Sequence, residues 1–182
     1  AAQQPFTSKY DAVLRSQARF TPAESRGMAL FRDPAKGNCA ACHQMNPASS
    51  NPADSLFTDF SYYAHGIPRN RAIPRNRDPG FFDLGLCGPE RSVPATPPGV
   101  DPASLCGKFR MPTLRNVAER PAYMHNGFFR DLADVVRFYA TRAGQPQRWW
   151  GPEGVPDDLP ARYRGNLETA KAPFNRPVGS AP

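Results

Sequence analysis

The residues with the clearest chemistry are Cys39, Cys42 and His43, in the stretch Cys39-Ala40-Ala41-Cys42-His43. Two thiols three residues apart can each form a thioether bond to one vinyl group of the same haem, and the adjacent histidine then lies beneath the iron. The spacing therefore predicts one covalently bound haem c with His43 as the proximal axial ligand.

Three other kinds of site use paired cysteines at this spacing: half of a zinc site, a redox-active dithiol and a local disulfide. Zinc needs a second ligand pair at comparable spacing, and the remaining Cys87 and Cys106 are too far apart in the sequence to supply one. A redox dithiol usually opens a helix after a strand in a βαβ unit, and no such alternation is visible. Haem attachment is therefore the preferred interpretation.

Cys87 and Cys106 have only each other as partners for a disulfide. Haem c is attached outside the bacterial cytoplasm, where disulfides also persist, so both features predict an exported, periplasmic protein. A bridge would close a loop of about 20 residues and stabilise the fold by roughly 3 kcal/mol. Two buried free thiols are the alternative. The sequence has no apolar run long enough to cross a membrane, so we expect no membrane insertion.

The composition favours short elements, because 22 of the 182 residues are proline. Proline at more than twice its usual share of about 5% is incompatible with long regular helices and strands. We therefore expect a mainly α, cytochrome c-like haem domain of short helices with long ordered loops, forming a single domain over residues 1–182. Residues 64–107 would be a long irregular loop pinned by the disulfide.

The net charge is +7, and the densest basic run contains Arg69, Arg71, Arg75 and Arg77. Prolines interrupt this run, and it lacks the periodicity of a recognition helix, so nucleic-acid binding is not expected. A solvated basic loop is the simplest interpretation. Steering of an acidic redox partner, or docking against another domain, is the alternative.

Two helices are predicted from their end signals. Thr21-Pro22-Ala23-Glu24 is a helix start that should run to about Arg32, with Met28 and Phe31 facing inward. The segment Asp131 to Arg142 has Asp131 as its cap and Gly144 as its stop. Its apolar positions form one stripe that turns Tyr139 towards the core and the expected haem, namely Leu132, Val135, Val136 and Tyr139.

Several short motifs follow one another at a characteristic spacing. They are Gly27-Met28-Ala29-Leu30-Phe31, Cys39–His43, Phe57-Thr58-Asp59, Asp83-Leu84-Gly85, the block Phe109–Val117, Tyr123–Gly127 and the helix that carries Tyr139. In this order the chain resembles the C-terminal haem domain of the bacterial di-haem cytochrome c peroxidases and their MauG-like relatives. The resemblance covers most of the chain.

The resemblance implies that the last helix supplies the second axial ligand, methionine in the peroxidases and tyrosine in the MauG branch. An ungapped alignment from Pro112-Thr113-Leu114-Arg115-Asn116 puts Tyr139 at that position, in agreement with the apolar stripe. Tyr139 as a core aromatic with a hydrogen-bonded hydroxyl is the alternative. Met111 and Met124 are competing ligands, or core methionines. A phenolate ligand would stabilise ferric iron and lower the potential, whereas a thioether would raise it.

The resemblance also implies that Arg115 and His125 lie close to the haem. Arg115 would pair with a propionate, or equally with a protein carboxylate or a helix end. His125 would orient a ligand or line the face towards a partner haem, or it would be a structural turn histidine.

The sequence departs from the family in having one Cys-x-x-Cys-His motif, so the N-terminal haem domain, where the peroxidases carry out peroxide chemistry, has no counterpart in it. The calcium that the family holds between its two haem domains is doubtful for the same reason. Our first hypothesis is a mono-haem cytochrome with a His43/Tyr139 haem, which transfers electrons to a redox partner protein or to a second haem domain. The alternatives are the electron-relay half of a peroxidase or oxidase, and a five-coordinate haem that reacts with peroxide itself.

Overall fold

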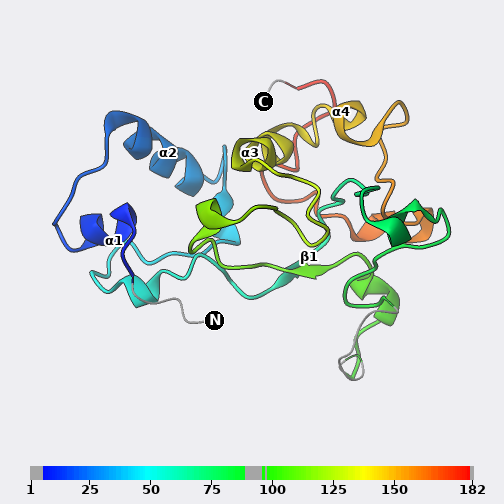
Figure 1. Ribbon diagram of the computed structural model, residues 1–182, viewed down its shortest axis with the longest axis horizontal. Coiled ribbons are helices and arrows are strands. Elements are labelled where there is room, and N and C mark those ends of the chain that lie inside the picture. The colour runs from blue at the N-terminus through cyan, green and yellow to red at the C-terminus, as the bar shows by residue number, and fades with distance from the viewer. Residues whose placement is uncertain (1–5, 89–95, 97, 181–182) are drawn as a thin grey trace. The chain divides into compact units, whose positions relative to one another are not determined.

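A computed structural model describes residues 6–88, 96 and 98–180 (Figure 1). The chain forms two compact units, each built from two stretches of sequence. The first contains Ala1–Ser61 and Met111–Glu119, and the second contains Tyr62–Arg110 and Arg120–Pro182. Short helices and loops dominate both, which is consistent with the mainly α class. Among the described residues, no helix combines the length and apolar character that crossing a membrane requires.

The first unit contains helices α1, Lys9–Leu14, and α2, Pro22–Arg32. The start of α2 confirms the predicted cap, because Thr21 Oγ1 accepts from the Glu24 amide and the Glu24 carboxylate accepts from the Thr21 amide. Met28 and Phe31 are half-buried on an otherwise exposed helix, as expected for its inner face. Short 3₁₀ turns follow at Cys39–Ala41, Pro52–Asp54 and Val117–Glu119.

The second unit contains a small antiparallel pair of strands, in which β1, Tyr62–Tyr63, lies beside β2, Phe109–Arg110. Helices α3, Leu132–Thr141, and α4, Pro146–Trp150, follow (Figure 1). Further 3₁₀ turns lie at Pro74–Arg77, Pro102–Leu105 and Ala161–Asn166.

Helix α3 packs on a stripe that differs from the predicted one. Phe138 is fully buried with Ile67 and Phe129, and Val135 and Tyr139 pack against this cluster. Val136, predicted to face inward, is 62% exposed. The inner face is therefore the i, i+3, i+4, i+7 set that begins at Val135 and ends at Arg142, which is 2% exposed. A search for apolar residues at helical spacing does not detect this face, because its last member is an arginine.

The two ends of α3 differ in how well they were predicted. Asp131 is the cap, as expected, because its carboxylate accepts from the Ala133 amide. Gly144 lies beyond the helix end at Thr141, and its backbone is not in the left-handed region that a glycine stop requires. A Cβ at position 144 would lie 2.6 Å from the Ser180 carbonyl oxygen. Glycine is needed here for the close approach of the C-terminal tail.

The long segment 64–107 is irregular but ordered where it is described. The structure joins Cys87 to Cys106 by a disulfide, with Cα atoms 4.8 Å apart. Most of the segment between them, residues 89–95 and 97, lies outside the described residues.

The arginine run is only partly solvated. Arg71, Arg75 and Arg77 are exposed, as expected for a basic loop. Arg69 is 5% exposed and forms an ion pair with buried Asp158, with 3.2 Å between Nε and Oδ1. The expectation of a solvated loop is therefore wrong for Arg69, because this side chain folds back into its own unit.

Candidate haem-binding site

The attachment motif forms a single tight turn in the first unit. Asn38 has left-handed backbone with φ 51°, and Cys39–Ala41 is a 3₁₀ turn. The His43 amide donates to the Cys39 carbonyl over 2.8 Å, so both cysteines and the histidine belong to the same turn. Neither Cys39 nor Cys42 is in a disulfide, and burial raises the pKa of the Cys39 thiol. Two cysteines beside one histidine suit thioether attachment.

Backbone packing brings α2 close to this turn. A Cβ at Gly37 would lie 2.5 Å from the Leu30 carbonyl oxygen, near the end of α2. Only glycine allows this approach without a shift of the backbone. The glycine before the motif therefore lets the chain leave α2 and enter the cysteine turn directly.

His43 is held in the tautomer that suits an iron ligand. Its Nδ1 lies 2.9 Å from the Phe57 carbonyl oxygen, which can only accept, so Nδ1 carries the proton. Nε2 then bears the lone pair. Burial lowers the pKa of His43, while hydrogen bonding to the Phe57 backbone, the charge of Asp59 and hydrogen bonding to the Pro112 backbone oppose this shift. Such a hydrogen bond on the far nitrogen is the usual support of a metal-bound histidine.

The donor set fits a haem better than a bare metal ion. In the part of the chain that the structure describes, no three His, Cys, Asp or Glu side chains gather as the ligands of one ion. Two cysteines and one histidine in a single turn have the pattern of a haem c site, in which the thiols bind the macrocycle and the histidine binds the iron.

Tyr139 lies on the inner face of α3 in the second unit and is half-buried. Its ring contacts Phe174 and His65, and the ring centroids are 5.4 Å apart in each case. Burial lowers the pKa of the nearby Arg142 guanidinium, and Tyr139 partly opposes this shift. These contacts agree with the inward orientation that the sequence predicted. His43 and Tyr139 belong to different units, so their joint ligation of iron stays a prediction.

The other candidates divide between the two units. Met111 is buried in the first unit, at 4% exposure, and its carbonyl accepts from the Thr58 hydroxyl. Met124 has φ 68° and packs against the aromatic core of the second unit. His125 stacks on Phe109 with ring centroids 3.5 Å apart. A structural role is thus visible for each, and their roles towards haem stay predictions.

Arg115 pairs with a protein carboxylate, which was one of its three expected roles. Its Nη1 lies 2.6 Å from Asp11 Oδ1, and its other nitrogens donate to the carbonyls of Pro52 and Ser55. Hydrogen bonds from Ser8 and the pairing with Arg115 lower the pKa of Asp11, outweighing the desolvation that raises it. Sequence reasoning missed Asp11, because it lies 104 residues before Arg115 and no local spacing links them.

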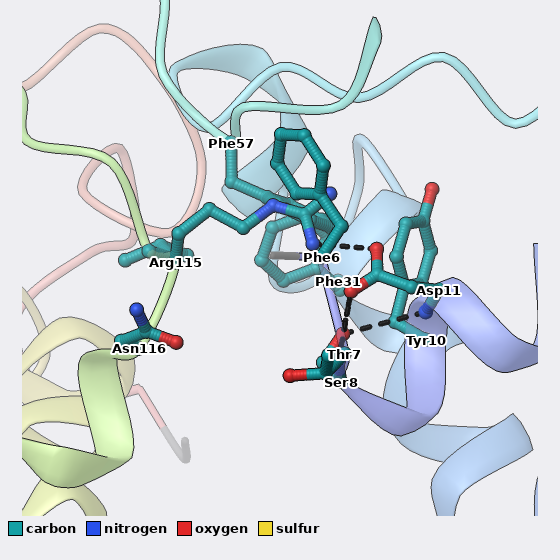
Figure 2. A pocket seen from close by; sticks show the side chains of 10 residues that line it. Phe6, Thr7, Ser8, Tyr10, Asp11, Phe31, Phe57, Arg115 and Asn116 are labelled. Carbon is teal, nitrogen blue, oxygen red and sulfur yellow. Dashed lines mark hydrogen bonds and ion pairs between the residues drawn. The ribbon is translucent and has the colours of Figure 1, made fainter. Parts of the chain in front are cut away.

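A cavity of about 210 Å³ opens beside this pair in the first unit. Figure 2 shows the Arg115 side chain reaching towards the Asp11 carboxylate among the rings of Phe6, Phe31 and Phe57. The guanidinium carbon lies 4.7 Å from the Phe6 ring centroid and 5.3 Å from that of Phe57. The aromatic rings therefore cover the charge that the ion pair buries.

Solved structures define the class of protein. The fold matches the di-haem peroxidase BthA of Burkholderia thailandensis with a TM-score of 0.86 and 46% sequence identity, over 97% of this chain and 42% of that one. A variant of BthA matches with a TM-score of 0.87. No protein-family model matches the chain.

Curated relatives narrow the class to a family. The methylamine utilization protein MauG of Paracoccus denitrificans is 36% identical over 171 residues, which are 92% of this chain and 41% of MauG. The cytochrome-c peroxidase IdrP1 of a Pseudomonas species is 31% identical over 138 residues, 67% of this chain and 32% of that protein. The chain is a homologue of the MauG and di-haem cytochrome c peroxidase family and corresponds to the C-terminal part of its members. It spans about two fifths of the length of MauG.

Proposed function

We propose that the chain is a haem c domain of a di-haem peroxidase or MauG-like protein, and that it relays electrons. The observation that carries this proposal is the geometry of His43, whose Nδ1 is hydrogen-bonded to a backbone carbonyl while Cys39 and Cys42 lie in the same turn. The likeness to the di-haem peroxidase BthA over nearly the whole chain supports it.

Each residue of the site has a distinct task. Cys39 and Cys42 anchor the haem, His43 Nε2 is the proximal ligand, and Tyr139 is the second axial ligand. The haem, when bound, supplies one-electron chemistry that the protein alone lacks. With both axial positions occupied by side chains of this chain, peroxide has no place to bind, which suits a relay rather than a catalytic centre.

The partner of the relay is a second haem domain or a redox protein in the periplasm. Exposed Arg71, Arg75 and Arg77, with the overall charge of +7, suit an acidic partner surface. The second candidate function is a mono-haem cytochrome that exchanges electrons between proteins, which the same exposed arginines and the charge of +7 would suit.

The test is to produce the chain in a periplasm with haem c maturation and to record its mass and spectra. We expect one covalent haem per chain, lost in the double variant Cys39→Ala/Cys42→Ala, and a low-spin ferric spectrum that peroxide leaves unchanged. Tyr139→Phe should convert this spectrum to a high-spin one. Met111→Leu, a swap of similar volume at a buried position, is the matched control and should leave it unchanged.

Other outcomes discriminate among the candidates. A spectrum that is unchanged in Tyr139→Phe but altered in Met111→Leu would overturn the tyrosine assignment. Rapid peroxide turnover by the isolated chain would contradict the relay and indicate an open iron. Peroxidase activity that returns only when a second haem domain is added would favour the relay over a free-standing mono-haem cytochrome.

A further inference from the structure

The proximal side of the site depends on the carbonyl group of Phe57. This carbonyl accepts the hydrogen bond from His43 Nδ1, and Phe57 has a backbone φ of 54°. A bulky residue rarely adopts this left-handed conformation. It persists where surrounding contacts over-determine it. The orientation of His43 therefore depends on whatever holds the chain at residue 57.

Hydrogen bonds tie the segment around Phe57 on both sides to residues 111–115. On one side, Thr113 Oγ1 donates to the Leu56 carbonyl. On the other side, Thr58 Oγ1 donates to the Met111 carbonyl over 2.7 Å, and this bond is buried. Both bonds lie within the first unit, so the conformation at residue 57 is fixed by contacts distant in sequence but local in that unit.

Arg115 fixes the same segment one residue further back. Its Nε and Nη2 donate to the Ser55 carbonyl over 3.0 and 2.8 Å, and Nη2 also donates to the Pro52 carbonyl. Its remaining terminal nitrogen pairs with Asp11, which is itself fully buried. Asp11 Oδ2 accepts from the amide and hydroxyl of Ser8 over 2.9 and 2.6 Å, so helix α1 anchors the pair (Figure 2).

We propose that Asp11 and Arg115 are positioning residues for the proximal ligand, which hold residues 55–57 so that the Phe57 carbonyl stays in hydrogen-bonding distance of His43 Nδ1. The inference rests on the proposed function, because it takes His43 as the ligand of a haem iron. A hydrogen bond to Nδ1 orients the imidazole and raises the basicity of Nε2. A more basic ligand stabilises ferric iron, so the remote ion pair keeps the midpoint potential low.

The test is a spectroelectrochemical titration of the haem-loaded chain, with NMR measurement of solvent exchange at His43 Nδ1. Arg115→Lys keeps a positive charge beside Asp11 but loses the planar guanidinium that donates hydrogen bonds to the Ser55 and Pro52 carbonyls. Asp11→Asn keeps an acceptor but loses the charge. We expect both variants to raise the midpoint potential, changing the ferrous-to-ferric ratio at a fixed potential by up to roughly tenfold, and to speed exchange of the Nδ1 proton.

Arg69→Lys is the matched control, because it makes the same change in the buried Arg69–Asp158 pair of the second unit. It should lower stability without moving the potential or the exchange rate. Ser8→Ala removes the hydroxyl's hydrogen bond to the Asp11 carboxylate and the bond that Ser8 Oγ accepts from the Asp11 amide, but leaves the ion pair with Arg115 in place. It is the mildest variant, and the same two measurements on it test the inference if the other variants do not fold.

Wild-type potential and exchange in the folded variants would overturn the inference, as would an equal shift in Arg69→Lys. Failure of the wild-type chain to attach haem would instead contradict the proposed function, so the two failures are distinguishable.

Discussion

At the scale of single residues, each unit contains a buried arginine that forms an ion pair with a buried aspartate. Arg115 pairs with Asp11 in the first unit, and Arg69 pairs with Asp158 in the second. Arg69 also donates from Nη1 to the carbonyls of Asn76 and Asp78. Removing one partner of such a pair is costly, because the other charge is left buried without compensation.

Arg69→Met should therefore lower the free energy of unfolding by about 3 to 5 kcal/mol. Urea denaturation of the holoprotein measures this change. Arg71→Met is the control, since Arg71 is 67% exposed and its contact with Asp157 is 3.5 Å long; its effect should stay within about 0.5 kcal/mol. Equal losses in the two variants would contradict the structural role of Arg69.

Asp158 gives the second unit a pH-dependent stability. Burial raises the pKa of this carboxyl from 3.8 to about 6; Arg69 opposes the shift, and Asp157 and Asp83 add to it. Because the folded protein holds the proton more tightly than the unfolded chain, the contribution to stability is full below pH 3.8 and is lost as the pH rises through about 6.

We expect the wild-type protein to lose up to about 3 kcal/mol of this contribution across that range. Asp158→Asn removes the titrating group, so its unfolding free energy should fall less than that of the wild type between these pH values. Denaturation curves at several pH values measure the difference. Parallel pH profiles for the two proteins would show that Asp158 does not titrate in this window.

At the scale of elements, α3 positions both an aromatic core and the candidate ligand Tyr139. Phe138 is completely buried against Phe129 and Trp149, with ring centroids 5.4 and 5.2 Å away. Val136, two positions earlier, faces solvent. The helix therefore presents Val135, Phe138 and Tyr139 together, and packing at Phe138 sets the direction in which Tyr139 points.

Phe138→Ala should cost about 3 to 5 kcal/mol of stability, because it leaves a cavity in the aromatic cluster. Val136→Ala on the same helix should change stability by less than about 0.5 kcal/mol. Thermal unfolding measures the stability that each variant loses. Phe138 belongs to the observed inner face of α3, and Val136 belongs to the inner face expected from apolar spacing. A larger loss in Val136→Ala would favour the latter.

At the scale of the whole molecule, a proline-rich chain with short helices relies on long-range ties. The bridge between Cys87 and Cys106 closes a loop with a sequence separation of 19. Such a bridge stabilises chiefly by limiting the unfolded chain.

The double variant Cys87→Ser/Cys106→Ser should lose roughly 3 kcal/mol of stability while retaining its haem. Peptide mapping without reduction checks that the bridge exists, and thermal unfolding measures its effect. Wild-type protein with two free thiols at these positions would overturn the prediction of a disulfide.

Local sequence determined the features whose causes are local. The Cys39–His43 motif, the Thr21 capping box and the Asp131 cap each depend on residues within one or two turns, so their spacing could be interpreted directly. The order of short motifs also identified the family, which the relatives confirm.

The tertiary structure alone decided which charged residues are buried and which backbone positions are strained. Asp11 meets Arg115 across 104 residues, Arg69 meets Asp158 from distant segments, and α3 places Arg142 on its inner face. No spacing rule predicts such pairs, because the sequence does not distinguish an arginine that will be buried from one that will stay exposed. Only the packing of the folded chain decides which arginine loses its hydration. The backbone of Phe57 lies in the left-handed region, and its carbonyl is hydrogen-bonded to His43 Nδ1. This conformation likewise depends on contacts between residues that are distant in the sequence.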